Sequence, residues 1–367
     1  MKGENLCAVR LTLIGSSIRF ELTVFEYWLR RALKEGTTLN AAVESLYPTS
    51  GGGRPSKIAI IGAGAVGTAV AYACAMRGDA RDIVLYDIDK ARAEAEALDI
   101  AHGIQFTPAG SVEGSNDIEI IRGSDLVIVT AGAKQKPGQT RIDLAESTVN
   151  LMHTIVPQIL EAAPDAYHMY ITNPVDIVTY AALKISGLPR NRVFGSGTVL
   201  DTSRLRYLVS RRTGVAIKNI HAYVAGEHGD SEVALWSSAE IGNVPLRHWG
   251  PTVDGSLFDA DLRDEIAHEV VNSAYRIIEG KGATNYAIGL AASNIATAFL
   301  RDENRVLTIC SLLEDWHGIS DVVMAAPTLV DRNGAGRVLE PPLTLRERDG
   351  LTASAEQLRS VAKSLGL

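Results

Sequence analysis

Two short motifs contain side chains of the kinds that move protons and bind anions. Residues 226–232 read GEHGDSE and place His228 between small residues on an expected loop. Residues 198–206 read TVLDTSRLR, in which Asp201 and Arg204 share one face of an expected helix. A carboxylate can hold an imidazole in one tautomer, and a guanidinium can bind a carboxylate through two parallel hydrogen bonds. The motifs suggest an acid–base site for a carboxylate substrate; a structural histidine and a solvated ion pair are the alternatives.

A glycine-rich turn suggests a dinucleotide site. The segment GAGAVG, residues 62–67, follows the apolar run KIAII, and Gly62, Gly64 and Gly67 would allow a tight turn, close approach to a pyrophosphate and close helix–strand packing. Asp87 ends the run IVLYD, 20 residues after Gly67, where a carboxylate accepts hydrogen bonds from a ribose diol. The next residue, Ile88, is not basic, so NAD is favoured over NADP. A glycine turn without a ligand is the alternative.

Seven features occur in one order along the chain. They are GAGAVG, Asp87, AGAKQKPGQTR at 131–141, ITNPVD, SGTVLDTSRLR, GEHGDSE and KGATNYAIG. Together they resemble the NAD-dependent L-lactate/malate dehydrogenase family, and within it the bacterial L-lactate dehydrogenases. The resemblance runs from about Lys57 to the C-terminus.

The resemblance implies roles for individual residues. His228 is implied to be the proton donor and acceptor, paired with Asp201, while Arg204 binds the substrate carboxylate. Arg141, on a mobile loop, is implied to polarise the carbonyl group that is reduced. Further implied substrate contacts are Asn173 and Thr284, and implied NAD contacts are Gly62, Gly64, Val66, Gly67, Asp87, Arg92, Gly132, Ala133, Thr154, Thr172, Asn173 and Ser196. No metal is implied. One departure is Ile118, where the lactate enzymes often have a tyrosine that contacts the cofactor.

Gln135 bears on the choice between lactate and malate. The tip of the 131–141 loop would meet the substrate's side chain, opposite the carboxylate bound by Arg204. An arginine at 135 would suit a second carboxylate, whereas neutral Gln135 would leave that charge buried and unpaired, at a cost of at least several kcal/mol. The sequence therefore favours pyruvate over oxaloacetate. An ordinary polar loop residue is the alternative for Gln135.

Two further positions suggest an effector site. Arg206 lies two residues after Arg204, and two helical steps turn roughly 200°, so the two arginines point to opposite sides. His221 precedes His228 by seven residues. In the bacterial enzymes that the chain resembles, the positions of Arg206 and His221 bind fructose 1,6-bisphosphate at a two-fold interface, which implies an activated homotetramer. Solvated surface or interface groups are the alternative.

Alternating apolar runs predict the elements that would position these residues. Strands are expected at 57–61, 82–86, 126–130 and 168–172, with helices at 66–76, 91–102 and 149–162. Later helices are expected at 201–212, 231–241, 261–279, 284–299 and 353–365. Strands near 305–313 and 321–330 are expected to form a hairpin, with a turn at 331–334 and a return strand near 337–341. The fold class is therefore α/β: a Rossmann-type doubly wound parallel sheet at 57–195, followed by a mixed α+β substrate domain at 196–367.

The first 56 residues have a different character. A short amphipathic helix at 24–34 and a glycine-rich linker at 50–56 are expected. The segment is expected to be a poorly ordered N-terminal extension or the result of a start codon assigned too far upstream, with a docking helix as the alternative. The segment lacks the pattern of a secretory signal.

Composition restricts the class of protein. The chain has 367 residues, 46% of them apolar, and a net charge of -7, which disfavours nucleic-acid and membrane-surface partners. No apolar run reaches the roughly 18 residues of a bilayer span. Cys7, Cys74 and Cys310 form no disulfide or zinc pattern, so a cytoplasmic enzyme is expected. Alternatives are a malate or broader 2-hydroxy-acid dehydrogenase, and a non-catalytic NAD-binding protein.

Overall fold

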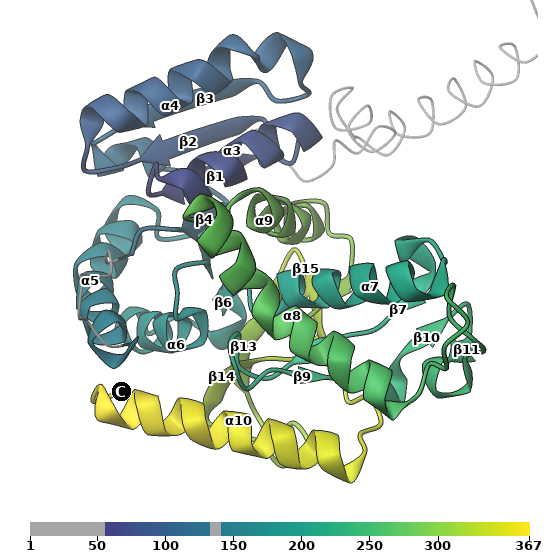
Figure 1. Ribbon diagram of the computed structural model, residues 1–367. Helices are drawn as coiled ribbons and strands as arrows, with labels where there is room; N and C mark the ends of the chain where they lie inside the picture. The colour runs from purple at the N-terminus through teal and green to yellow at the C-terminus, as the bar shows by residue number, and fades with distance from the viewer. Residues whose placement is uncertain (1–55, 133–140) are drawn as a thin grey trace, which may run out of the picture. The chain divides into compact units, whose positions relative to one another are not determined.

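An eight-stranded sheet forms the centre of the described fold. The computed structural model describes residues 56–132 and 141–367, apart from the side chains of Arg141 and Ile142. The sheet has the order β14-β13-β6-β5-β4-β1-β2-β3 (Figure 1). Strands β1 to β6 are mutually parallel, whereas β13 runs antiparallel to β6 and β14 runs antiparallel to β13.

The first half of this part of the chain alternates strands and helices. Its elements are β1 (Lys57–Ile61), α3 (Ala65–Arg77), β2 (Asp82–Tyr86), α4 (Lys90–His102), β3 (Ser111–Ser115), β4 (Leu126–Val129), α5 (Arg141–Ala162), β5 (Tyr167–Tyr170), α6 (Val175–Ser186) and β6 (Val193–Gly195). Every strand and helix expected here is present. Three elements, β3, α6 and β6, were not predicted from the sequence, and α5 begins eight residues before the expected start at 149.

Alternation along the strands sends apolar side chains to both faces of the sheet. On β1, Ile58 and Ile60 pack in one core with α3, α4 and α9. Ala59 and Ile61 pack in a second core with α5 and α6. Because both faces are covered, the doubly wound arrangement expected from the sequence is confirmed. The strand order reverses between β1 and β4, and the crevice at the carboxyl ends of such strands is where ligands bind.

The second half of the chain is mixed. It contains α7 (Val199–Thr213), β7 (Ile220–His221), β8 (Val224–Ala225), β9 (Val233–Ala234), β10 (Glu240–Ile241), β11 (Val244–Pro245), α8 (Ala260–Lys281), α9 (Tyr286–Leu300), β12 (Arg305–Leu307), β13 (Cys310–Leu313), β14 (Val322–Ala325), β15 (Thr328–Asp331), β16 (Gly334–Val338) and α10 (Leu345–Ser364). No helix among the described residues has the length and apolar character needed to cross a membrane.

The helix expected at 231–241 is wrong. Val233 and Ala234 pair with β8, and Glu240 and Ile241 pair with β7 and β11. Pairing with β7, β8 and β11 overrides the helical propensity of this stretch.

The strands after residue 305 belong to two different sheets, and not to the single hairpin that was expected. β13 and β14 pair with each other in the main sheet, whereas β12, β15 and β16 form a separate three-stranded sheet. The turn at 331–334 is confirmed, because Asp331 pairs with Gly334 between β15 and β16. The last helix, α10, begins at Leu345, eight residues before the expected start at 353. Thr344 and Glu347 form a capping box at this N-terminus.

Candidate active site

Asp201 and Arg204 lie on α7, and neither is on a solvated face. Asp201 is 2% exposed, and the side chain of Arg204 is 13% exposed. Arg204 Nη1 donates a hydrogen bond to Asp201 Oδ1 over 2.6 Å. The solvated ion pair considered as an alternative is therefore wrong, and the pair is a buried one in which a guanidinium compensates a carboxylate.

His228 lies on the loop that joins β8 to β9, and three neighbouring elements hold this loop. Gly226 exchanges backbone hydrogen bonds with Ala325 of β14. The backbone N–H of Glu227 donates to Ser354 Oγ on α10 over 2.8 Å, and that of His228 donates to Asp176 Oδ2 on α6 over 2.8 Å. The sequence analysis assigned no role to Ser354 or Asp176, although Asp176 belongs to the ITNPVD motif.

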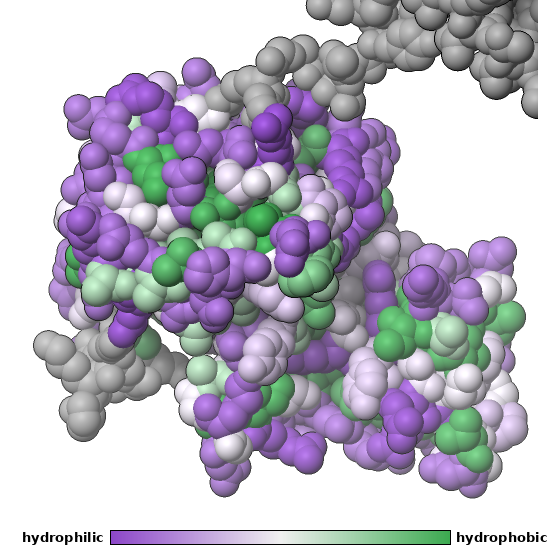
Figure 2. Space-filling view, turned by 90° about the horizontal axis from the view of Figure 1, so that it is seen from above, coloured by the Kyte–Doolittle hydropathy of each residue, from purple (hydrophilic) through white to green (hydrophobic). Residues whose placement is uncertain are grey.

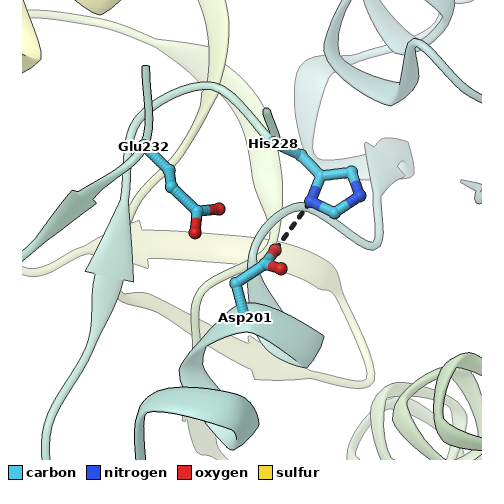
Figure 3. Close-up of side chains that lie close together, drawn as sticks. All are labelled: Asp201, His228 and Glu232. Carbon is cyan, nitrogen blue, oxygen red and sulfur yellow. Dashed lines mark hydrogen bonds and ion pairs between the residues drawn. The ribbon is translucent and has the colours of Figure 1, made fainter. Parts of the chain in front are cut away.

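The imidazole of His228 meets the carboxylate of Asp201. His228 Nδ1 lies 2.6 Å from Asp201 Oδ2 (Figure 3). This contact favours the tautomer with a proton on Nδ1, which leaves Nε2 to exchange a proton with a substrate. The side chain of His228 is 24% exposed, so the ring is held firmly and keeps access to ligands.

Electrostatics favour the charged pair. Burial lowers the pKa of His228, but the charge and hydrogen bond of Asp201, together with the charges of Asp176 and Glu232, outweigh it and raise the pKa to about 9. Burial raises the pKa of Asp201, and His228 and Arg204 together hold it below its usual value. At neutral pH the pair is therefore an imidazolium beside a carboxylate.

Glu232 is a third ionisable side chain at this site. Ligand atoms of Asp201, His228 and Glu232 lie within 4.8 Å of one another, a spacing that could hold a metal ion. Both oxygens of Asp201 and Nδ1 of His228 are already engaged in hydrogen bonds. The arrangement therefore suits proton transfer better than metal coordination. The sequence analysis missed Glu232, although it ends the GEHGDSE motif.

The glycine turn fits a dinucleotide. Gly62 has φ +106°, and a Cβ on Gly67 would lie 1.9 Å from the carbonyl oxygen of Gly62, so the turn and the helix–strand packing require both glycines. A Cβ on Gly64 would meet no atom within 4 Å. Protein packing therefore leaves room at Gly64, at the N-terminus of α3, where backbone N–H groups can bind a pyrophosphate.

Asp87 follows β2 and supports the glycine turn. Its Oδ2 accepts a hydrogen bond from the backbone N–H of Ala63 over 2.7 Å, and its Oδ1 accepts one from Asp89 over 3.0 Å. Each carboxylate oxygen can accept further bonds, so Asp87 can also receive hydroxyl groups of a ribose. Ile88 beside it is 86% exposed and offers no charge for a 2′-phosphate.

Several other implied positions lie at the carboxyl ends of parallel strands. Gly132 follows β4, and Thr172 Oγ1 donates to the carbonyl of Ala131 over 2.8 Å, which links the ends of β4 and β5. Asn173 is exposed and precedes Pro174 through a cis peptide bond. Ser196 follows β6 and is buried. These positions therefore share the edge of the sheet that carries the glycine turn.

The remaining implied positions are more scattered. Val66 is half-buried on α3, Arg92 is exposed on α4, Thr154 is exposed on α5, and Thr284 is half-buried before α9. Within the described residues, none of these four side chains forms a hydrogen bond with the acid–base pair. Ala133, Gln135 and the side chain of Arg141 lie outside the described residues, as does the N-terminal extension with its expected helix and linker.

Arg206 lies on α7, two residues after Arg204, and His221 lies on β7. Arg206 Nε donates to the carbonyl of Ala222 over 2.9 Å, and the guanidinium lies 5.1 Å from the ring centroid of Tyr223. His221 is exposed on β7. Arg206 therefore contacts the segment that follows His221 directly, and it lines a cavity of about 350 Å³.

Comparison with known proteins agrees with this arrangement. Residues 56–195 match the NAD binding domain of lactate/malate dehydrogenases, and residues 198–365 match the α/β C-terminal domain of the same family. An L-lactate dehydrogenase of Bifidobacterium animalis subsp. lactis (strain AD011) is 55% identical over 313 residues, covering 85% of this chain and 98% of that protein. One from Thermoanaerobacter sp. (strain X514) is 45% identical over 313 residues, covering 85% of this chain and all of that protein (100%).

Solved structures give the same result. A lactate dehydrogenase enzyme from a Medee basin deep-sea metagenome library superposes with a TM-score of 0.81 at 36% identity, covering 86% of this chain and 100% of that one. A minor L-lactate dehydrogenase from Enterococcus mundtii gives 0.80 at 37% identity, covering 84% and 98%. The family models, these relatives and the NAD-compatible glycine turn together show that the chain is an NAD-dependent oxidoreductase that belongs to the lactate/malate dehydrogenase family.

Proposed function

We propose that the chain is an L-lactate dehydrogenase, which interconverts L-lactate and pyruvate. The observation that carries this proposal is the 2.6 Å contact between His228 Nδ1 and Asp201 Oδ2, formed beside Arg204 on the same helix. The names of relatives at 55% and 45% identity support it.

Each residue of the site has its own role in the proposed reaction. The glycine turn would hold NAD, which would supply the hydride chemistry: the oxidised form would take the hydrogen on carbon 2 of lactate with its bonding electron pair, and the reduced form would return it to pyruvate. His228 takes the proton of the substrate hydroxyl at Nε2 during oxidation and returns it during reduction. Asp201 holds the Nδ1 proton and stabilises the imidazolium. The guanidinium of Arg204 has donors left after its bond to Asp201, and these bind the substrate carboxylate.

An assay with two keto acids tests the proposal. NADH oxidation is followed with pyruvate and with oxaloacetate, and we expect pyruvate to be the better substrate. A His228→Asn variant should lose about 10²- to 10⁴-fold of the activity, the usual contribution of a positioned acid–base group. Preference for oxaloacetate would identify a malate dehydrogenase instead, and unchanged activity of His228→Asn would contradict the role of the histidine.

We further propose that Gln135 selects for a monocarboxylate and that Arg141 polarises the substrate carbonyl. This proposal rests on the sequence. A Gln135→Arg variant should shift the ratio of kcat/KM for pyruvate and oxaloacetate towards oxaloacetate, because the new guanidinium can pair with the second carboxylate. A ratio that does not change would contradict it.

We propose that fructose 1,6-bisphosphate activates the enzyme through Arg206 and His221. The contact of Arg206 with Ala222 and Tyr223 supports this proposal, because it brings one cation against the segment next to His221. Two subunits that each supplied such a pair would be bridged by a bisphosphate. The sugar bisphosphate should lower the KM for pyruvate, and an Arg206→Ala variant that kept the full response would contradict the site.

We propose a cytoplasmic homotetramer in which residues 57–195 bind NAD and residues 196–367 bind the substrate. Large apolar side chains exposed on α3 and α9, namely Tyr72, Met76, Tyr286 and Leu290, support an association of subunits. Figure 2 shows apolar side chains gathered in patches between polar ones. The free, buried thiols of Cys74 and Cys310 suit a reducing compartment. Sedimentation of the purified protein tests the tetramer, and a monomer at micromolar concentration would exclude it.

A further inference from the structure

Glu232 lies on the same loop as His228 but has no partner for its charge. Its carboxylate points towards Asp201 and His228 (Figure 3). Its Oε1 is buried without a hydrogen-bond partner, and within residues 56–132 and 141–367 its carboxylate forms no hydrogen bond or ion pair. Asp201 already receives both His228 and Arg204, so these two cations are committed to another carboxylate. A negative charge on Glu232 would therefore be a second, uncompensated charge at the site.

The surroundings of Glu232 favour its neutral form. Burial raises its pKa, and the charge of Asp201 raises it further, to about 9, against the opposing effects of His228 and Arg204. Asp230 on the same loop also raises it. Glu232 also lines a cavity of about 700 Å³, whose other charged residues are Arg247, Arg263, Asp264, Arg346 and Glu347. Asp264 and Arg346 pair with each other, and Glu347 is engaged in the cap of α10.

This cavity is separate from the acid–base pair. Its lining residues come from the segment 232–237, Arg247, α8 and the region around the start of α10, and His228 and Asp201 are not among them.

We propose that Glu232 is a positioning residue that limits substrate binding in alkaline solution: its neutral carboxyl group allows a substrate carboxylate to bind at Arg204, and its ionisation repels that carboxylate. The inference rests on the proposed function, in which the substrate is a carboxylate. Protonated His228 is the form that reduces a keto acid, and neutral Glu232 is the form that admits the acid. Loss of either proton therefore reduces kcat/KM. Because both groups must keep their protons, the alkaline fall in kcat/KM with pH should correspond to the loss of two protons.

The test compares KM values at two pH values. Glu232→Gln keeps the size and the neutral form but cannot ionise, and Glu232→Ala is a second neutral variant. With a pKa of about 9, ionisation of Glu232 should raise the pyruvate KM of the parent enzyme about tenfold between pH 7 and pH 10. Both neutral variants should lack this rise when each is compared with its own KM at pH 7. Their alkaline fall in kcat/KM should involve one proton instead of two.

Asp264→Asn is the matched control, because it removes an exposed carboxylate from the same cavity and should keep the rise of the parent enzyme. Neutral variants that retain the rise in KM would overturn the inference. A parent enzyme that reduces neither pyruvate nor oxaloacetate would instead overturn the proposed function, so the two failures are distinguishable.

Discussion

At the scale of single residues, Asp201 is one buried carboxylate that serves two cations. One oxygen receives Arg204 and the other receives His228, each over 2.6 Å. A buried charge is tolerated when it is paired and hydrogen-bonded, and here the pairing also determines which nitrogen of the imidazole carries a proton. The two cations therefore offset the cost of burying Asp201, and the same carboxylate orients His228 and Arg204 for the roles proposed for them.

The pKa of His228 leads to a prediction for both directions of the reaction. Burial lowers this pKa, and Asp201, with smaller contributions from Asp176 and Glu232, raises it to about 9. In the proposed mechanism, reduction of pyruvate uses the imidazolium, so its kcat/KM should be constant at neutral pH and fall above about pH 9. Oxidation of lactate uses neutral His228, so its kcat/KM should rise with pH up to the same value. Initial rates from pH 6 to pH 10, with NADH binding measured at each pH as a control, test this. An alkaline limb near the ordinary histidine value of about 6.5 would mean that Asp201 does not stabilise the imidazolium.

At the scale of elements, different glycines of the turn are required for packing and for ligand binding. A Cβ on Gly67 would collide with the carbonyl oxygen of Gly62, whereas one on Gly64 would meet open space. Gly64→Ala should therefore leave the melting temperature close to that of the parent protein but weaken NADH binding, because the new methyl group occupies the space of the pyrophosphate. Gly67→Ala should lower both the melting temperature and the affinity for NADH. Thermal unfolding and NADH fluorescence titration measure the two effects, and unimpaired NADH binding by Gly64→Ala would contradict the placement of the cofactor.

The loop that carries His228 depends on a contact with α10. Ser354 is fully buried, and its Oγ accepts from the backbone N–H of Glu227 and contacts Ser231 Oγ at 2.9 Å. Ser354→Ala leaves a buried N–H without a partner, so we expect a loss of about 1–3 kcal/mol in unfolding free energy and a lower kcat. Denaturant unfolding measures the first effect. Ser364→Ala, at an exposed serine near the end of the same helix, is the control and should change stability by less than about 0.5 kcal/mol. Equal stability of the two variants would mean that α10 does not hold the loop.

At the scale of the whole molecule, the two halves of the described chain share one sheet and one core. β13 pairs with β6 through Cys310 and Gly195, and α9 packs against α3, with Ala292, Ile295 and Phe299 in the same core as β1 (Figure 1). The boundary near residue 195 that the family models mark therefore separates two sequence units whose apolar cores are continuous.

This continuity predicts the behaviour of a truncated chain. A protein that ends at residue 195 lacks the strand beside β6 and the helix that covers α3, so it would expose a sheet edge and an apolar face. We expect it to show no cooperative thermal unfolding, whereas the full-length chain should unfold cooperatively. Near-ultraviolet circular dichroism and calorimetry of both chains measure this. A cooperative transition in the truncated protein would show that the first half has a self-sufficient core.

The sequence by itself determined the alternation of strands and helices, the glycine turn and the identity of the acid–base motifs. These features depend on residue types and on spacing between near neighbours, and a period of two or 3.6 residues is visible without any knowledge of the fold. The helix expected at 231–241 was wrong for the same reason, because local propensity contains no information about the strands that pair with Val233 and Ile241.

Only the tertiary structure decided which distant side chains meet. His228 and Asp201 are 27 residues apart in sequence, and Ser354 is 127 residues from Glu227, yet both pairs lie within hydrogen-bonding distance. Glu232 is one more acidic residue in the sequence, and its burial beside an already satisfied carboxylate makes it a neutral acid. Burial and distance between elements arise from packing of the whole chain, and they set the pKa values on which the chemistry depends.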